Sequence, residues 1–174
     1  VNRLFILLTL LIILFPPGLN AQNSNPENTA EKLTFEDIPV LVVLAGYDNF
    51  YVDALYADND LLYINIQELF LALHISCVSG KNLERFNGFI ETEKNTYLID
   101  YNEKQIKVGN QLFNINNEIV QENGVLYMES SAFENIFGLS LSFNFRSLTV
   151  ILKSDFELPL IKQQRKENQR KNIS

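Results

Sequence analysis

The chain has 174 residues, a net charge of −7 at neutral pH, one cysteine and one histidine. The acidic residues are concentrated between positions 22 and 154, where eighteen acidic and eight basic residues give a net charge of −10. An acidic body is unsuited to binding nucleic-acid phosphates, which need a basic surface. A single cysteine excludes an intramolecular disulfide.

The first residues have the pattern of an exported protein. Arg3 precedes an unbroken apolar run from Leu4 to Phe15, and Ala21 follows a few positions later. This pattern predicts a secretory signal peptide at 1–21. An uncleaved anchor is the alternative, although the run is shorter than the ~20 residues of a membrane span. The polar segment 22–36 is predicted to be a disordered leader, which leaves enough chain for about one domain.

The domain is predicted to begin with three strands joined by turns. Apolar runs rich in β-branched and aromatic residues, bounded by turn residues, predict strands at Pro39–Leu44, Phe50–Tyr56 and Leu61–Ile64. The period then changes to that of a helix of about two turns, from Ile66 to His74. Asn65 and Glu68 have the spacing of an N-cap and its reciprocal partner.

The middle of the chain is predicted to contain further strands. They are expected at Ile75–Val78, Phe86–Glu91 and Thr96–Tyr101, followed by a hairpin of Gln105–Val108 with Gln111–Ile115. In the hairpin, Lys107 and Asn114 are predicted to face water, opposite an apolar face that includes Ile106 and Ile115.

A second helix follows a short apolar strand at Val125–Met128. It is predicted at Ser131–Phe137, with Ser131 as its N-cap and Gly138 as its stop. Two strands complete the prediction, at Leu141–Phe145 and Leu148–Leu152.

The two helical segments belong to an internal repeat with an offset of 64 residues. The segment Asn59–Ile64 aligns with Asn123–Met128, and the alignment continues without a gap through the helices. His74 therefore matches Gly138, a helix-terminal position. The predicted fold class is α+β, mainly antiparallel β with two short helices. Its two related strand-helix-strand units, at about 59–92 and 123–154, pack together in a domain at 37–154, before a basic tail or linker at 155–174.

Few residues suggest chemistry. The lone His74 has no paired ligands for zinc and no marked nucleophile beside it, so no metal, cofactor or catalytic triad is predicted. Cys77 aligns with an apolar residue and is expected to be a small buried hydrophobe. The carboxylate pairs Asp58/Asp60 and Glu91/Glu93 are predicted to be solvated turn residues.

Two surfaces are candidates for binding. Tyr63 and Tyr127 occupy equivalent strand positions, either as framework residues or, if exposed, as rings that stack on a glycan. The basic segment is either a solvated helix or tail, or a contact site for a partner or acidic lipid, through Lys162, Arg165, Lys166 and Arg170. The terminal Asn172-Ile173-Ser174 matches a glycosylation acceptor.

The repeated pattern resembles the copper amine oxidase N-terminal-like, or stalk, domain. The resemblance is carried by Leu61-Leu-Tyr-Ile64 and Val125-Leu-Tyr-Met128, by Leu73-His-Ile75 and Phe137-Gly-Leu139 at the helix ends, and by the closing strand Leu148–Leu152. It implies a noncatalytic envelope module, because the copper and quinone chemistry of that family lies elsewhere.

A second resemblance covers positions 88–172. Gly88-Phe-Ile90, Tyr97-Leu-Ile-Asp100 and Leu158-Pro159, followed by Arg165, Glu167 and Arg170, are similar to the periplasmic N-terminal portion of usher-like outer-membrane proteins of Gram-negative bacteria. This similarity implies that the chain is a truncated product or fragment, with a missing C-terminal barrel as one partner.

The sequence therefore predicts a noncatalytic, exported protein-interaction module, periplasmic or associated with the outer membrane. A cell-wall or glycan-binding module is the alternative. An enzyme is the third hypothesis, and it requires a cleft that brings His74 together with carboxylates.

Overall fold

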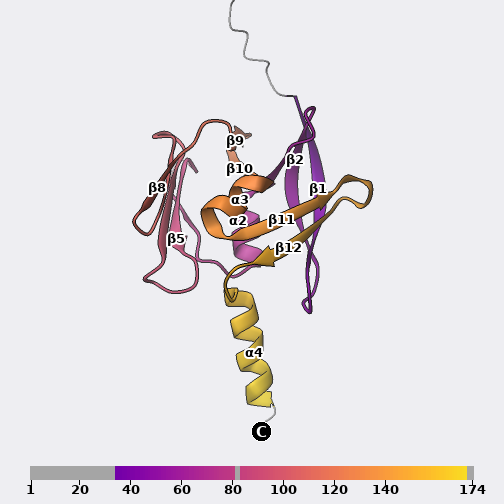
Figure 1. Cartoon of the computed structure of the whole chain (residues 1–174), viewed down its shortest axis with the longest axis vertical. Coiled ribbons are helices and arrows are strands. Elements are labelled where there is room, and N and C mark those ends of the chain that lie inside the picture. The colour runs from indigo at the N-terminus through magenta and orange to yellow at the C-terminus, as the bar shows by residue number, and fades with distance from the viewer. Residues whose placement is uncertain (1–33, 81–82, 172–174) are drawn as a thin grey trace, which may run out of the picture. The chain divides into compact units, whose positions relative to one another are not determined.

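The computed structural model describes residues 34–80 and 83–171 (Figure 1). Within these residues the chain forms twelve strands, three α-helices and a short 3-10 helix at Phe145–Ser147. All pairs of neighbouring strands but one are antiparallel, so the predicted α+β class is confirmed. The predicted signal peptide at 1–21, most of the predicted leader and the acceptor site at 172–174 lie outside the described residues.

The larger sheet has seven strands in the order β11-β12-β1-β2-β3-β10-β9. They are β1 (Phe35–Leu44), β2 (Phe50–Ala57), β3 (Leu62–Asn65), β9 (Ile119–Glu122), β10 (Val125–Glu129), β11 (Leu139–Asn144) and β12 (Thr149–Ser154). β1 begins inside the predicted leader, because Phe35 pairs with Ala57 and its ring meets the Tyr63 ring edge-on at 5.6 Å. Strand β9 was not predicted.

The smaller sheet is a five-stranded antiparallel meander. Its strands are β4 (Val78–Ser79), β5 (Arg85–Phe89), β6 (Thr96–Asp100), β7 (Gln105–Val108) and β8 (Gln111–Asn114). The β7–β8 hairpin is confirmed, with Lys107 exposed and Ile106 buried. The predicted strand at Ile75–Val78 is correct only at Val78, where β4 begins. The Ser76 carbonyl accepts a hydrogen bond from the Tyr97 hydroxyl at 2.8 Å and not from the backbone of a neighbouring strand.

The two predicted helices are present, with different caps. In α2 (Ile66–Ala72), the Asn65 side chain accepts from the Glu68 N–H at 3.2 Å, as predicted. The Glu68 carboxylate accepts from the Asp53 N–H at 2.8 Å instead of returning to Asn65. The predicted Ser131 cap is wrong: α3 (Ser130–Phe137) begins one residue earlier, and the Ser131 hydroxyl donates to the Glu129 carboxylate.

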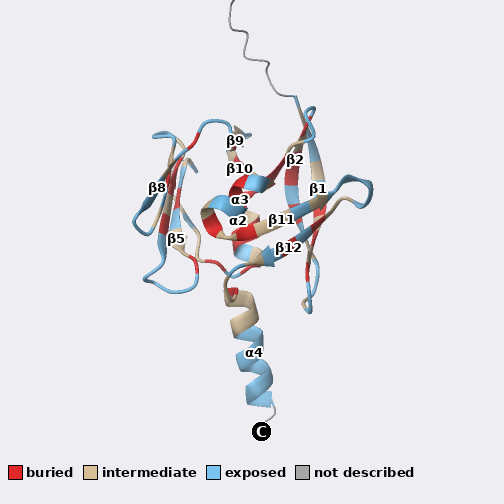
Figure 2. Ribbon diagram, in the orientation of Figure 1, coloured by how far each residue is buried: buried red, intermediate tan, exposed pale blue. Residues whose placement is uncertain are grey.

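Both helices contact the two sheets through one continuous core (Figure 2). Phe70 of α2 and Phe137 of α3 meet Tyr97 of the smaller sheet edge-on, at 5.4 and 5.6 Å between ring centroids. Phe133 is fully buried beside them. Burying one such ring stabilises the fold by about 1.5–3 kcal/mol, and this ring cluster links both helices to the smaller sheet.

Strands β3 and β10 occupy the same position in the two repeats, and they pair with each other. Ile64 lies opposite Met128, its own equivalent at an offset of 64, while Tyr63 lies opposite Glu129. When equivalent residues pair with themselves in this way, a local two-fold axis runs between the strands.

The hairpins that follow α2 and α3 keep the same register. Ser79 pairs with Phe86 in the first, and the residues 64 positions later, Phe143 and Val150, pair in the second. The two hairpins nevertheless belong to different sheets. Each copy of the repeat therefore comprises a strand, a helix and a hairpin. The copies differ in the sheet to which the hairpin belongs.

The segment predicted to be a basic tail or linker is helical over most of its length. α4 spans Pro159–Lys171, and the buried Leu158 precedes it. The Leu160 N–H donates to the Leu73 carbonyl at 3.2 Å, which fixes the start of α4 to the end of α2. Beyond Lys162 the helix is exposed (Figure 2). No helix in the described part of the chain is long and apolar enough to cross a membrane.

Candidate functional site

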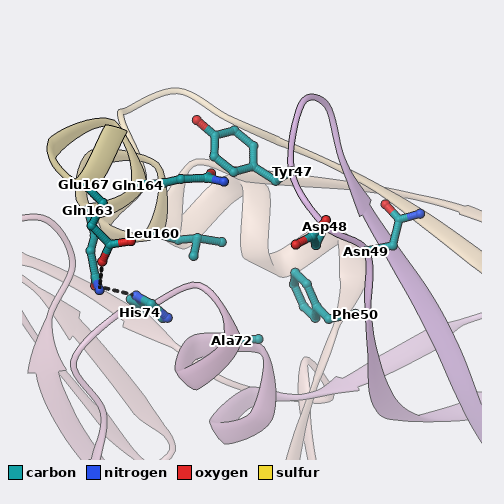
Figure 3. A pocket seen from close by; sticks show the side chains of 10 residues that line it. All are labelled: Tyr47, Asp48, Asn49, Phe50, Ala72, His74, Leu160, Gln163, Gln164 and Glu167. Carbon is teal, nitrogen blue, oxygen red and sulfur yellow. Dashed lines mark hydrogen bonds between the residues drawn. The ribbon is translucent and has the colours of Figure 1, made fainter. Parts of the chain in front are cut away.

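A cleft of about 370 Å³ lies where the β1–β2 turn, the end of α2 and the first turns of α4 meet (Figure 3). We call it the α4 cleft. Its lining combines aromatic, amide and carboxylate side chains with one imidazole: Tyr47, Asp48, Asn49, Phe50, Ala72, His74, Leu160, Gln163, Gln164 and Glu167.

His74 reaches the cleft because the chain reverses after α2. Its φ of 58° is left-handed, like the φ of 69° at the equivalent Gly138, which ends α3. The Ile75 N–H then donates to the Phe70 carbonyl at 2.8 Å and closes the turn. A left-handed conformation costs a residue with a Cβ about 1–2 kcal/mol, a cost that glycine avoids.

One face of α4 forms the opposite wall. Leu160, Gln163, Gln164 and Glu167 recur at helical spacing, so they lie on the same side of the helix. Figure 3 shows the Leu160 side chain directed between the β1–β2 turn and the end of α2. The basic residues of α4 do not line the cleft.

A chain of hydrogen bonds crosses the cleft. The Gln163 Nε2 group donates to Glu167 Oε1 at 3.0 Å, and Gln163 Oε1 lies 3.0 Å from His74 Nδ1 (Figure 3). Because the carboxylate accepts and the amide nitrogen donates, the amide oxygen must face the imidazole as an acceptor. His74 Nδ1 donates to this oxygen in the tautomer that carries its proton on Nδ1.

The cleft brings His74 together with two carboxylates, Asp48 and Glu167, as the enzyme hypothesis required. Glu167 is linked to the imidazole only through Gln163. Among the residues that line the cleft, Tyr47 alone carries a hydroxyl and none carries a thiol. The lining therefore suits binding through hydrogen bonds and ring contacts better than attack by a hydroxyl or thiol nucleophile.

Cys77 is partly buried and packs against the core, whereas the sequence predicted a buried residue. Burial raises the pKa of its thiol, although a hydrogen bond with Tyr97 acts in the opposite direction. A raised pKa disfavours the thiolate, which is the reactive form. Among the described residues, no cluster of three or more His, Cys, Asp or Glu side chains could hold a metal ion.

Tyr63 and Tyr127 are not available for stacking on a glycan. Tyr63 is 0% exposed and Tyr127 is 7% exposed, within a small apolar cluster on the face of the larger sheet away from the helices. Their burial corrects the predicted glycan contact and agrees with the framework interpretation. Burial raises the pKa of both phenols, and the Tyr63 hydroxyl has no hydrogen-bond partner.

The four predicted contact residues of the basic segment all lie on α4. Lys162, Lys166 and Arg170 are four residues apart, along one stripe of the helix. Arg165 forms a two-pronged pair with the Glu157 carboxylate, with nitrogen–oxygen distances of 2.7 and 3.1 Å. That pair holds the start of α4 and engages Arg165 within the chain.

Sequence reasoning missed most of the α4 cleft. Tyr47, Asp48 and Asn49 were interpreted only as turn residues. The available signal was the helical recurrence of Leu160, Gln163, Gln164 and Glu167, which is separate from the basic stripe. No family model matches the chain, and no curated protein or solved structure is significantly similar to it.

Proposed function

We propose that the chain is an exported, noncatalytic module of the cell envelope that binds another protein through the basic stripe of α4. The proposal rests on one observation: α4 is a thirteen-residue helix without a fully buried residue, fixed to the body at its first turn. A helix that is polar around its circumference gains little from its own fold and is typical of segments that bridge to another body.

Charge supports the choice of α4 as the contact. The body carries a net charge of −10, whereas positions 155–174 contain five basic and three acidic residues, a net charge of +2. Lys162 and Lys166 lie on α4, in which Glu167 is the one acidic residue. A partner with an acidic surface would be attracted to this end, and the attraction would weaken as salt is added.

The sequence resemblance suggests the setting. In usher-like proteins such a module occupies the periplasmic N-terminal region of a larger outer-membrane protein. The partner is then either another part of that protein or a neighbouring envelope protein.

Export is tested by the mass of the mature protein. A Gram-negative host that expresses the full chain with a C-terminal tag should yield periplasmic or membrane-associated protein cleaved after Ala21. Recovery of the uncleaved chain in the cytoplasm would contradict the proposed location.

The contact is tested by crosslinking in the same cells. A photoreactive side chain at Lys166 should capture a discrete partner, and capture should fall several-fold in a Lys162→Glu variant of that protein. The matched control places the photoreactive group at Lys107, an exposed lysine on β7. Equal capture from both positions, or capture unaffected by Lys162→Glu, would refute α4 as the contact.

A further inference from the structure

We infer that the α4 cleft is a binding site for a short N-acetylated saccharide of one or two sugar units. This inference is independent of protein binding by α4, because the residues that line the cleft and the basic stripe are different side chains of the helix. It also places glycan recognition away from Tyr63 and Tyr127, whose rings are buried.

Charge excludes anionic ligands from the cleft. Asp48 and Glu167 contribute two carboxylates, and no lysine or arginine lines the cleft. A phosphate or other anion would face net repulsion, whereas a neutral ligand rich in hydroxyl groups can donate to both carboxylates.

The polar groups are suited to paired hydroxyl groups. Asn49 and Gln164 each offer a planar amide with a donor and an acceptor side by side, and Gln163 keeps one N–H and one oxygen lone pair beyond its bonds to Glu167 and His74. Gln163 is already oriented by His74 and Glu167, at 3.0 Å from each. A side chain that is held in place before binding loses less freedom when the ligand arrives.

The apolar groups are suited to the other side of a sugar ring. Tyr47, in the β1–β2 turn, and Phe50, the first residue of β2, are half-buried and supply aromatic surface at one wall. Leu160 and Ala72 provide aliphatic surface between the walls, where the methyl of an N-acetyl group would be removed from water. The volume of about 370 Å³ is near the lower end of ligand sites, about 300–1,000 Å³, and limits the ligand to one or two units.

The conformation of His74 is the second line of support. The fold places a left-handed residue after each repeat helix, and the second repeat uses Gly138 there. The first repeat has His74 instead, with the same left-handed φ and its imidazole in the cleft wall. The left-handed turn therefore places the His74 imidazole in the cleft wall, 3.0 Å from Gln163 Oε1.

The single histidine gives a direct assay. Because the chain has only one histidine, its imidazole proton resonances in an NMR spectrum belong to His74 without further assignment. Titration of the purified protein with di-N-acetylchitobiose should shift them saturably, with a dissociation constant in the millimolar range. Inorganic phosphate, added as a separate probe at the same pH, should not.

Matched tyrosine variants locate the binding. Tyr47→Ala removes a ring of the cleft and should weaken binding roughly tenfold, as expected for the loss of about 50 Å² of apolar contact. Tyr51→Ala removes a 71% exposed ring outside the cleft and should leave binding unchanged. Circular dichroism of each variant confirms that it is folded, and Gln163→Ala provides a second cleft variant if Tyr47→Ala is not.

Three results would overturn the inference. They are the absence of a saturable shift with the sugar, a shift with phosphate alone, and equal weakening by the Tyr47 and Tyr51 substitutions. A Lys162→Glu variant that still binds the sugar but no longer crosslinks its partner would separate this site from protein binding by α4.

Discussion

A Gly88→Ala substitution should strongly destabilise the protein, because it removes the close approach of β5 to the segment that connects α2 to β4. Gly88 lies in β5, opposite Tyr97. A Cβ at this position would lie 1.8 Å from the carbonyl oxygen of Ser76 and 3.0 Å from the Tyr97 ring. The Ser76 oxygen is a backbone atom, so no rotation of a side chain can relieve the overlap.

The expected loss has two parts. Moving the backbone at residues 75–77 away from β5 is an overpacking change, which costs about 1–3 kcal/mol. The same movement weakens the 2.8 Å hydrogen bond from the Tyr97 hydroxyl to Ser76, for about 1 kcal/mol more. The sum, about 2–4 kcal/mol, is a large part of the roughly 5–15 kcal/mol that stabilises an ordinary domain.

Urea unfolding monitored by circular dichroism measures this loss as a fall in the midpoint at constant slope. The matched control is Asn87→Ala, at the exposed neighbouring position of the same strand, which should change the free energy of unfolding by less than about 0.5 kcal/mol. If Gly88→Ala unfolds at the same urea concentration as this control, the contact between Gly88 and Ser76 does not limit the packing of β5 against the segment that follows α2.

Other perturbations have equally specific outcomes. Tyr63→Phe should raise the free energy of unfolding by about 1 kcal/mol or more, because it removes a buried hydroxyl without a hydrogen-bond partner. A lower melting temperature for the variant would contradict this. The Arg85 guanidinium lowers the pKa of Asp100, so Arg85→Ala should cost about 1–2 kcal/mol at pH 7. A depressed pKa gives stability that is present above the ordinary carboxyl pKa and lost below it, so the two proteins should converge in urea midpoint as the pH falls below about 4. Deletion of 162–174 should leave a cooperatively unfolding body, whereas Leu158→Ala should lower the free energy of unfolding by about 2–4 kcal/mol, because its side chain is fully buried.

The sequence predicted the elements whose side chains alternate clearly or recur at helical spacing. The β7–β8 hairpin and the position of α2 were correct for this reason. Strand β9 was missed because only two of its four residues, Ile119 and Val120, are apolar, which is too short a pattern to predict a strand. It forms a strand by pairing with β10. The Ser131 cap failed because α3 begins at Ser130, which puts Glu129 at the N-cap position and Ser131 inside the first turn.

The site was less predictable than the fold. Tyr47 and Gln164 are more than a hundred positions apart, and only the docking of Leu158 and Leu160 brings α4 to the β1–β2 turn. The repeat did predict that His74 ends its helix as Gly138 does, and both residues are left-handed in the structure. What the repeat could not give is the direction of the imidazole, which depends on Gln163.

The parallel pairing of β1 with β12 determines the order in which the domain can be completed. Leu41 lies opposite Thr149, so the first strand of the body gains this partner only after nearly all of the domain has been synthesised. Until then, the edge of β1 is an open row of backbone donors and acceptors, of the kind that invites pairing with another chain. A chain that is still bound to the ribosome therefore exposes Leu41–Leu44 as an unpaired edge, and a chaperone that shields this edge would improve its yield.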